Sequence, residues 1–411
     1  MSFETLSLPR AEAAWGALAQ HVRPGRMRDL ALEQAIGAVL AADAPAAMDY
    51  PPYDRAVMDG YAVRAADVAG APARLRLGGL VPAGAAPSAA LESGTCIQIN
   101  TGAVVPGGAD AIVPVEDAAP GEDGRVVINE APRPGQHIER RGAICAPGDV
   151  LAPAGTRIGC VTAAALAAGG VARVRVFARP QVALVTTGSE LVEQGSRLQH
   201  GQIHETNSLA LSEQITRAGG EVLYQGRCAD EPAALHAALE LGLAHDVLVV
   251  TGGMSKGTHD LAPAQLERLG VQWLVSGLDL KPGKPTRIGR GPSGCWVLGL
   301  PGNPVSCAVC FALFGAPLLA GLQGLAVRPP AMLSGGLDEP MKSNGLRPMF
   351  QPGLWRTNGL REACVRPLAW RGSGDPFGLA RANALIYRPS NAPPAVEGER
   401  VSFVVLDTPA P

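Results

Sequence analysis

The sequence is poor in aromatic residues and has no excess of charge of either sign. Aromatic residues make up 4% of the 411 positions and hydrophobic residues 47%, so a core must be built largely from Ala, Val and Leu. The formal net charge is −2, from 35 basic and 37 acidic residues. Such a balance creates no field that attracts a polyanion. We therefore expect no nucleic-acid partner.

Targeting and membrane signals are also missing. The opening stretch MSFETLSLPRAEAAW has no basic region followed by an apolar core, which a secretory signal requires. We find no apolar run of the roughly 18 to 20 residues that cross a membrane. The expectation is a cytoplasmic protein with no membrane partner.

The eight cysteines are scattered rather than paired as in a small secreted scaffold, so reduced thiols are expected. Cys307 and Cys310 form a CxxC, but it lies inside the apolar run PVSCAVCFALF. A spacing of three places both on one face of a helix. With no second pair and no histidine at ligand spacing, a structural zinc site is not supported, and a buried, inert pair is expected.

The chain length predicts about two to four domains. Residues 1–47 contain two patterns typical of amphipathic helices, RAEAAWGALAQHV and LALEQAIGAVLAADA. Residues 48–141 read as short β-like runs separated by Gly, Pro and Asp, which predicts a β-rich domain. Residues 142–178 return to an Ala-rich helix flanked by β-like segments.

Strand and helix patterns alternate through residues 179–328. Near-continuous apolar strands separated by helices indicate a parallel sheet covered on both faces, which is the doubly wound α/β class. From residue 329 to 411 the helical periodicity stops and short strand patterns remain, so a small C-terminal β-barrel fits best, with a sandwich as the alternative. The fold class is therefore α/β and multidomain.

The residues that directly follow three of the predicted strands share a composition. They are Thr186-Thr187-Gly188-Ser189-Glu190, Thr251-Gly252-Gly253-Met254-Ser255 and Pro301-Gly302-Asn303-Pro304. Ligands of parallel α/β sheets bind beyond the carboxyl ends of the strands. Glycines admit backbone NH groups close to a ligand, and the helix starts that follow favour negative charge. Neither GxGxxG nor a P-loop occurs, so it is the three loops together that predict a phosphate or oxyanion site.

Cations and carboxylates accompany these loops. The segment Lys281-Pro282-Gly283-Lys284-Pro285 places two ammonium groups three residues apart in a stretch that cannot be helical; a solvated basic turn is the alternative. Glu190, Glu205 and Asp260 follow or neighbour the loops. One or two carboxylates plus phosphate oxygens suit Mg²⁺, whereas helix N-caps are the other reading of these side chains.

Several stretches resemble the MoeA family, which includes the E domain of gephyrin. The sharpest is Met58-Asp59-Gly60-Tyr61-Ala62-Val63, followed by Thr101-Gly102-Ala103 with Gly108-Ala109-Asp110-Ala111, and by Arg140-Arg141-Gly142. In the sheet domain TTGSE, TGGMSKG, KPGKP and LPGNPVS resemble family loops in the same order. The resemblance runs from about residue 25 into the C-terminal domain.

What this resemblance implies is a molybdopterin molybdenumtransferase, a homodimer that takes adenylylated molybdopterin and molybdate and, with Mg²⁺, releases AMP. The doubly wound domain would bind molybdopterin, and residues 1–47 with residues 142–178 would form an elongated linking and dimerisation domain of α/β type. A molybdopterin adenylyltransferase is implied as a further partner. The implied catalytic residues are Asp59, Asp260, Glu190, Lys281 and Lys284; the implied metal ligands are Glu190, Glu205 and Asp260; and the implied substrate-binding residues are Thr101, Gly102, Arg140, Arg141, Thr187, Gly188, Gly252, Gly253, Ser255, Pro285, Pro301, Gly302, Asn303, Ser306, Arg347 and Ser373.

The chain departs from the family pattern at two places. Glu205-Thr206-Asn207 stands where the family usually has Asp-Ser-Asn, and Lys256 and His259 add a cation and an imidazole. Three alternatives stay open. They are a molybdopterin adenylyltransferase, against which the additional domains argue, a non-catalytic pterin-binding scaffold, and a paralogue that uses tungstate, an ion of very similar size and charge.

Overall fold

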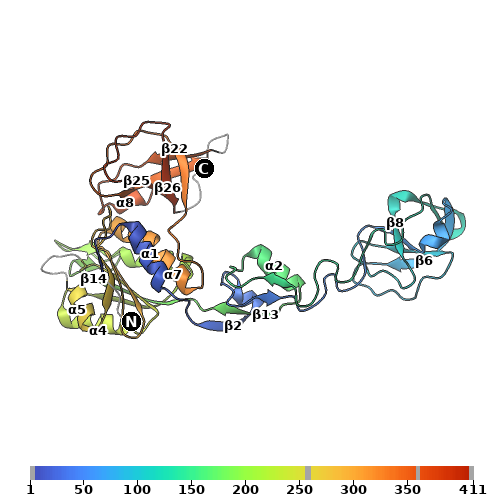
Figure 1. Cartoon of the computed structure of the whole chain (residues 1–411), viewed down its shortest axis with the longest axis horizontal. Coiled ribbons are helices and arrows are strands. Elements are labelled where there is room, and N and C mark those ends of the chain that lie inside the picture. Colours follow the sequence, from blue (N-terminus) through green and yellow to red (C-terminus); the bar gives the residue numbers. More distant parts are fainter. Residues whose placement is uncertain (1–4, 255–260, 358–361, 407–411) are drawn as a thin grey trace. The chain divides into compact units, whose positions relative to one another are not determined.

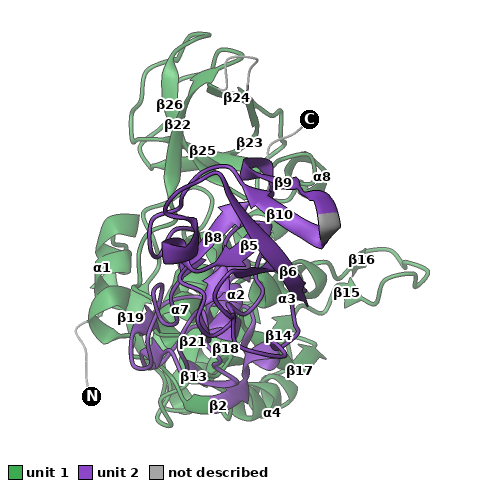
Figure 2. Cartoon of the chain, turned by 90° about the vertical axis from the view of Figure 1, so that its right-hand side faces the viewer, with its two compact units in different colours: residues 1–28, 177–411 green, residues 29–176 purple. Residues whose placement is uncertain are grey.

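The computed structural model describes residues 5–254, 261–357 and 362–406 (Figure 1). The chain forms two compact units, residues 1–28 with 177–411 and residues 29–176, which Figure 2 colours green and purple. The first contains the sheet domain and the C-terminal barrel, and the second contains the β-rich region.

The sheet domain is built on seven strands in the order β1-β19-β20-β21-β18-β14-β17. Strands β21, β18, β14 and β17 are parallel, which confirms the doubly wound prediction. Strand β20 is antiparallel to both β19 and β21, and this antiparallel part was not predicted. The strands are β1 Leu6–Ser7, β14 Gln181–Thr187, β17 Glu221–Cys228, β18 Val247–Thr251, β19 Gln272–Ser276, β20 Arg287–Arg290 and β21 Trp296–Leu300.

Helices cover the sheet on both faces. Every residue of β18 and β21 is buried, because apolar side chains of a central strand pack against helices above and below. One core layer includes residues of α1, α3 and the helical stretch from α6 to α7, and the other includes α4 and α5. The helices are α1 Ala11–His21, α3 Asn207–Arg217, α4 Pro232–Gly242, α5 Ala262–Arg268, α6 Pro304–Cys310, the π-helical η5 Phe311–Gly315 and α7 Ala316–Leu322.

The stretch Pro304–Leu322 is one continuous helix of 19 residues with a mean hydropathy of 2.1. By length and composition it could cross a membrane, so the expectation that no apolar run is long enough was wrong. However, 78% of it is buried inside the protein, and Phe311, Leu313 and Phe314 pack in the core of the sheet domain. A buried core helix passes the same test of length and composition as a membrane span.

Helix α1 belongs to the sheet domain rather than to a linking domain. Ala14, Trp15 and Leu18 are buried in the same core as Leu298. The indole of Trp15 donates a 2.6 Å hydrogen bond to the carbonyl of Leu313. The structure therefore divides the chain at residue 28, whereas the sequence patterns placed residues 1–47 together.

The second unit contains a six-stranded sheet in the order β8-β5-β7-β6-β10-β9. Three two-stranded ladders join chain segments that are distant in sequence: β4 with β11, β3 with β12 and β2 with β13. The elements are β2 Met27–Ala31, η1 Leu32–Ala35, β3 Ala44–Pro45, β4 Arg55–Ala56, β5 Gly60–Val63, η2 Ala65–Val68, β6 Ala73–Val81, β7 Thr95–Ile99, β8 Ala111–Pro114, η3 Val115–Asp117, β9 Ala118–Pro120, η4 Glu122–Gly124, β10 Arg125–Ile128, β11 Ile138–Glu139, β12 Val150–Ala152, α2 Cys160–Ala168 and β13 Arg173–Phe177.

The helix expected over LALEQAIGAVLAADA does not form. Only Leu32–Ala35 is helical, as one 3-10 turn, and Gly37 follows with a φ of +84°. The backbone NH groups of Leu40 and Ala41 donate to the carbonyls of Thr156 and Arg175. Tertiary pairing thus outweighs the local helical pattern, as it commonly does for weak propensities.

The C-terminal part forms a closed barrel in the order β22-β24-β23-β25-β26, which confirms the predicted β-barrel. Leu337, Val365, Ile386 and Phe403 lie in its core. The elements are β22 Met332–Leu337, β23 Met349–Thr357, β24 Ala363–Pro367, the short helix α8 Pro376–Leu379, β25 Ala384–Arg388 and β26 Arg400–Val405. A parallel pair, β15 Leu191–Val192 with β16 Ile203–His204, follows β14 in the sheet domain.

Candidate functional site

A cavity of about 820 Å³ opens at the carboxyl ends of β14, β18 and β21. This is the edge of a parallel sheet at which ligands bind. The three loops that the sequence singled out all contribute to it, together with the start of α3 and the segment around α8. The residues that line it are Thr186, Thr187, Gly188, Glu190, Leu191, Ile203, His204, Glu205, Thr206, Asn207, Asp230, Thr251, Gly252, Gly253, Met254, Pro285, Pro301, Gly302, Asn303, Pro304, Gly374, Pro376 and Phe377.

Thr251 and Asn207 hold three of these segments together. The Asn207 side-chain amide donates to the Thr251 hydroxyl at 2.9 Å and to the carbonyl of Gly302 at 2.7 Å. The Thr251 hydroxyl in turn donates to the carbonyl of Pro301 at 3.1 Å, and Thr251 is 1% exposed. The end of β18, the start of α3 and the loop before α6 are therefore one hydrogen-bonded unit.

Gly252 shows why a glycine is needed at the end of β18. Its φ is +91°, and a Cβ there would lie 2.1 Å from the carbonyl oxygen of Thr187. Only glycine accepts both that conformation and that approach. As a result the β14 and β18 loops come close enough to form one floor of the cavity.

Asp230 organises the loop after β14. Its carboxylate accepts hydrogen bonds from the Thr187 hydroxyl at 2.7 Å and from the backbone NH of Ser189 at 3.2 Å. Its own NH donates to the Ser189 hydroxyl at 3.1 Å. Bonds to an ionised acceptor are stronger than neutral ones, so Asp230 both fixes this loop and brings a negative charge to the cavity.

The KPGKP loop borders the cavity through Pro285, and its two lysines are exposed. It is attached to the barrel, because the NH of Lys281 donates to the carbonyl of Pro348 and its carbonyl accepts from the NH of Phe350. The guanidinium of Arg347 donates to the carbonyl of Leu280 at 3.1 Å. Arg347 is thus held beside the start of the lysine loop.

Ser373 connects the barrel to the loop before α6. Its hydroxyl accepts a 3.0 Å hydrogen bond from the Asn303 amide, and its carbonyl accepts one from the NH of Val305 at 3.1 Å. Ser306 lies in the first turn of α6 and is 4% exposed. Of these two serines, Ser373 is the one bonded to a residue that lines the cavity.

Two carboxylates of the expected metal set line the cavity, but they differ in their partners. Both oxygens of Glu205 accept hydrogen bonds from Ser208, one from its NH at 2.9 Å and one from its hydroxyl. Glu205 therefore caps the start of α3. Glu190 is exposed and folds back over Gly188, where a Cβ would lie 2.8 Å from its carboxylate.

Among the described residues, no group of three or more His, Cys, Asp or Glu side chains is arranged to hold a metal ion. Cys307 and Cys310 are free and fully buried, and burial raises the pKa of each thiol to about 12. The expectation that the pair is buried is confirmed.

The expected residues of the second unit form a separate set of contacts. Asp59 accepts hydrogen bonds from the NH of Thr101 at 2.6 Å and from its hydroxyl at 3.0 Å, which lowers the pKa of the Asp59 carboxyl. Gly102 follows with a φ of +81°, and its carbonyl accepts a 3.4 Å bond from the Tyr53 hydroxyl. The Asp59–Thr101 pair is exposed.

The two arginines of this unit that the sequence selected, Arg140 and Arg141, are paired with aspartates. Arg140 contacts Asp54 at 2.6 Å, and Arg141 contacts Asp49 at 2.6 Å. Asp54 also accepts a 2.8 Å bond from the NH of Arg141. This backbone bond, followed by the bond from Arg140, lowers the pKa of Asp54.

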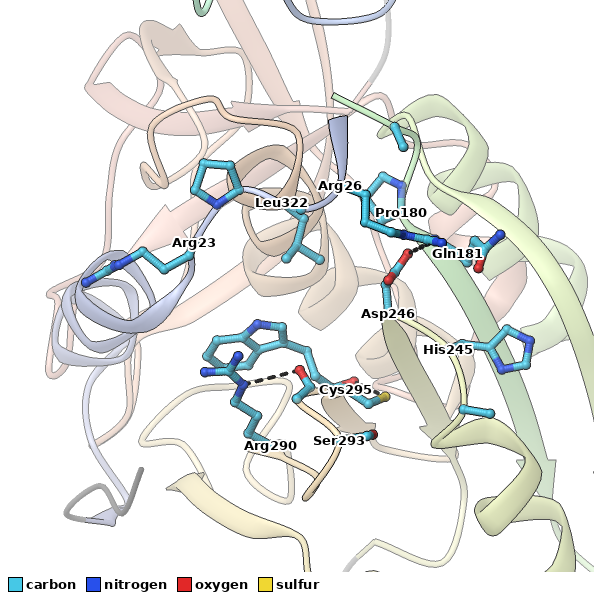
Figure 3. Close-up of a pocket in the computed structure, with 16 residues that line it drawn as sticks. Arg23, Arg26, Pro180, Gln181, His245, Asp246, Arg290, Ser293, Cys295 and Leu322 are labelled. Carbon is cyan, nitrogen blue, oxygen red and sulfur yellow. Dashed lines mark hydrogen bonds and ion pairs between the residues drawn. The ribbon is translucent and has the colours of Figure 1, made fainter. Parts of the chain in front are cut away.

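A second cavity, of about 400 Å³, opens at the opposite end of the strands (Figure 3). Its walls include Gln181 and Trp296, which begin β14 and β21. Asp246 accepts bonds there from Arg26 at 3.2 Å and from the NH of Gln181 at 2.8 Å, and Arg290 lies 5.5 Å from the centre of the Trp296 ring. The carboxylate of Asp246 is therefore bonded to Arg26 and to the start of β14, and Arg290 packs on Trp296. Ligands of parallel sheets bind at the carboxyl end, so we interpret this cavity as structural.

Comparison with known proteins agrees with this organisation. Family models match the MoeA N-terminal region, domains I and II, at residues 9–170, a probable molybdopterin binding domain at 183–321, and the MoeA C-terminal region, domain IV, at 334–406. The molybdopterin molybdenumtransferase of Nostoc sp. is 34% identical over 362 residues, which cover 86% of this chain and 83% of that relative. The chain belongs to the MoeA family.

Other relatives and solved structures agree with this membership. The molybdopterin molybdenumtransferase of Haemophilus influenzae is 32% identical over 92% of this chain and 94% of its own length. A structure of the MoeA protein of Pyrococcus horikoshii superposes with a TM-score of 0.81 at 32% identity, covering 98% of this chain and 100% of that one. Within the MoeA family, this chain is a transferase of molybdenum cofactor biosynthesis.

The structure brings together most of the MoeA-like residues of the sheet domain. Ser255 and Asp260 lie outside the described residues. The sequence patterns missed Asp230 and Thr251 as individual site residues, and Asn207 was noted only as part of a motif. Asp230 follows the carboxyl end of β17, so the strand-end rule that selected the other loops would have found it. The residues expected in the cavity that do line it are Thr187, Gly188, Glu190, Glu205, Gly252, Gly253, Pro285, Pro301, Gly302 and Asn303.

Proposed function

We propose that this MoeA-family transferase inserts molybdenum from molybdate into adenylylated molybdopterin and releases AMP. The observation that carries the proposal is the cavity at the carboxyl ends of β14, β18 and β21, whose floor is made of glycine-rich loops of the MoeA type. Backbone NH groups of such loops bind phosphate oxygens closely. The pyrophosphate of the substrate would lie on the loops that contain Gly188, Gly252 and Gly302.

Positive charge for molybdate would come from the lysine loop. Molybdate is a dianion, and Lys281 and Lys284 are exposed cations on the loop that enters the cavity at Pro285. Arg347 is bonded to the residue before this loop, and Ser373 is bonded to Asn303 in the cavity. We assign molybdate binding to these four side chains, together with Ser306 and Ser255 as the family resemblance implies.

Mg²⁺ fits the carboxylates of the cavity, because one or two carboxylates plus phosphate oxygens satisfy its preferences. Glu190 would hold it, with Asp260 as the family resemblance implies, whereas both oxygens of Asp230 already accept hydrogen bonds from Thr187 and Ser189. Glu205 is engaged by Ser208, so we give it the role of a cap. Bound Mg²⁺ would neutralise charge on the pyrophosphate during release of AMP. The protein's own part is to fix the loop around Thr187 through Asp230 and so to orient the phosphates.

We further propose a cytoplasmic homodimer that receives its substrate from a molybdopterin adenylyltransferase. Asp59, Thr101, Gly102 and one of Arg140 and Arg141 would act on the substrate held by the partner subunit, as the resemblance to MoeA implies. The paired Asp59 and Thr101 are exposed and so are accessible to a ligand.

The test is an insertion assay with purified protein, adenylylated molybdopterin, Mg²⁺ and either molybdate or tungstate. AMP release and pterin-bound metal are measured together. We expect AMP release that depends on the oxyanion and matches the metal bound. Pterin binding without transfer of either metal would support a scaffold instead, and transfer of tungstate in preference to molybdate would support the tungstate alternative.

A matched pair of variants tests the assignment of Mg²⁺. Glu190→Gln should raise the Mg²⁺ concentration needed for half-maximal AMP release, because it removes a charged ligand of the same shape. Glu193→Gln is the control, since Glu193 is exposed on the following segment and does not line the cavity. Equal Mg²⁺ dependence of the two variants would contradict a metal-binding role for Glu190.

A further inference from the structure

An aromatic side chain stands at the edge of the cavity. Phe377 is 80% exposed and lines the cavity beside the loop before α6. It is the one exposed aromatic residue in the part of the chain that the structure describes. Single exposed apolar residues are common on protein surfaces, so exposure alone assigns no role to Phe377. A role follows instead from the position of Phe377 at the cavity edge and from the fixed turn that carries it.

The turn that carries Phe377 is fixed. Asp375 accepts hydrogen bonds from the NH of Gly378 at 3.0 Å and from the NH of Arg371 at 2.9 Å, and Pro376 begins the helical turn of α8. A Cβ on Gly378 would lie 2.9 Å from the Asp375 carboxylate and 3.0 Å from Cβ of Trp370. The backbone of Phe377 is therefore packed tightly from below while its ring faces solvent.

The same turn is attached to the phosphate-binding side of the cavity. Ser373, two residues before Asp375, is bonded to Asn303 and Val305 at 3.0 and 3.1 Å. These bonds set the distance between the Phe377 turn and the loop that contains Gly302. A ligand whose phosphates lie on the glycine-rich loops would place the rest of its structure towards the cavity edge.

We infer that Phe377 is a stacking platform that selects a planar fused heterocycle of the substrate, adenine or pterin. The inference rests on the proposed function, because adenylylated molybdopterin carries both ring systems joined by the pyrophosphate. Besides Phe377, the cavity lining includes the imidazole of His204 and the apolar side chains of Leu191, Ile203 and Met254, but no other Phe, Tyr or Trp. An aromatic side chain at the cavity edge attracts a planar ring by offset stacking, independently of the pattern of its polar groups. Phe377 thus adds recognition of the ring to recognition of the phosphates.

Three ligands separate this inference from its alternatives. AMP reports on the adenine, molybdopterin without AMP reports on the pterin, and inorganic pyrophosphate reports on the phosphate loops alone. Binding of each is measured by calorimetry to the full-length parent and to Phe377→Ala, Phe377→Leu and Phe377→Trp. Val396→Ala is the control, because Val396 is 65% exposed in the same barrel and does not line the cavity.

We expect Phe377→Ala to weaken binding of AMP or of molybdopterin by about 5- to 150-fold, the range of a lost base–aromatic stack. Phe377→Leu should lose about 2- to 12-fold, because leucine keeps apolar contact but has no ring face. Phe377→Trp should restore parental affinity. Pyrophosphate should bind equally to all variants, and Val396→Ala should match the parent.

The ligand that is weakened identifies the ring. Loss for AMP assigns Phe377 to the adenine, and loss for molybdopterin assigns it to the pterin. If the parent binds both ligands and Phe377→Ala binds both with the same affinity, the inference is overturned while the proposed function stands. A parent that binds neither ligand contradicts the proposed function and the inference together.

Discussion

Replacing Thr251 by valine removes one hydroxyl from the centre of the hydrogen-bonded loops and leaves the shape of the side chain unchanged. Thr251 is 1% exposed, and its hydroxyl takes part in two hydrogen bonds, one from Asn207 and one to Pro301. In Thr251→Val the carbonyl of Pro301 loses a donor in a buried place. Asn207 keeps its bond to Gly302, so the contacts that are lost are those of β18 with the start of α3 and with the loop before α6.

The expected change in the free energy of unfolding follows from the number of hydrogen bonds that Thr251→Val loses. A neutral hydrogen bond contributes about 1 kcal/mol net, and a buried group left without a partner costs about 1 to 3 kcal/mol. We expect Thr251→Val to lower the free energy of unfolding by about 2 kcal/mol and to weaken pyrophosphate binding. Thr251→Ser keeps the hydroxyl and should retain most of the binding.

Thr286→Val is the matched control for stability. Thr286 is also fully buried, but its hydroxyl has no oxygen or nitrogen partner among the described residues, and its neighbour is the weakly interacting thiol of Cys310. Removing an unpaired buried hydroxyl should be neutral or stabilising. Urea unfolding followed by tryptophan fluorescence compares the two variants. If Thr251→Val is as stable as Thr286→Val, the hydrogen bonds of Thr251 do not hold the loops as we describe.

Three further predictions concern charged groups. Lys281→Ala and Lys284→Ala should each weaken the apparent affinity for molybdate about 10- to 150-fold, the loss of a hydrogen bond to a charged ligand, with an unchanged unfolding midpoint; unaltered molybdate dependence of both would rule out their role. The backbone hydrogen bond from Arg141 lowers the pKa of Asp54 from its usual value of 3.8 and stabilises the fold at neutral pH. Because this stabilisation is lost as pH falls through the lowered, folded-state pKa, Asp54→Asn should be less stable than the parent at neutral pH, and the urea titrations of the two should converge only below that folded-state pKa; a difference that persisted at still lower pH would contradict this. Mixing Asp59→Ala and Asp260→Ala subunits should restore part of the activity that each homodimer lacks, whereas independent sites in each subunit would show no rescue.

The strand ends of the sheet domain could be predicted because their signal is local. Strands β14 and β18 are runs of buried apolar residues that stop at a threonine followed by glycine. A run of this kind indicates a central strand, and the glycine marks its end. The places of the three loops directly after predicted strands were therefore enough to predict that they meet at the carboxyl edge of the sheet.

The hairpin formed by β19 and β20 could not be recognised in the same way. Strand β20, Arg287–Arg290, has arginines at both ends and glycine inside, so its composition has no apolar run. It is a strand because both neighbours pair with it. Likewise the boundary at residue 28 depends on the packing of Trp15 against the segment around Leu313, almost 300 residues away.

Glu205 shows what sequence position alone leaves undecided at a site. A carboxylate near a glycine-rich loop can bind a metal or cap a helix, and the residue types required are the same. The decision depends on hydrogen bonds to Ser208, three residues further along the chain, and these engage both of its oxygens. Asp230 is the opposite case, since it arises from a different strand and reaches the loop of Thr187 only in the folded protein. A metal bound to the pyrophosphate therefore depends more on Glu190 than on Glu205, and a Glu205→Gln variant, which keeps one acceptor oxygen for the NH of Ser208, should change the Mg²⁺ requirement less than Glu190→Gln does.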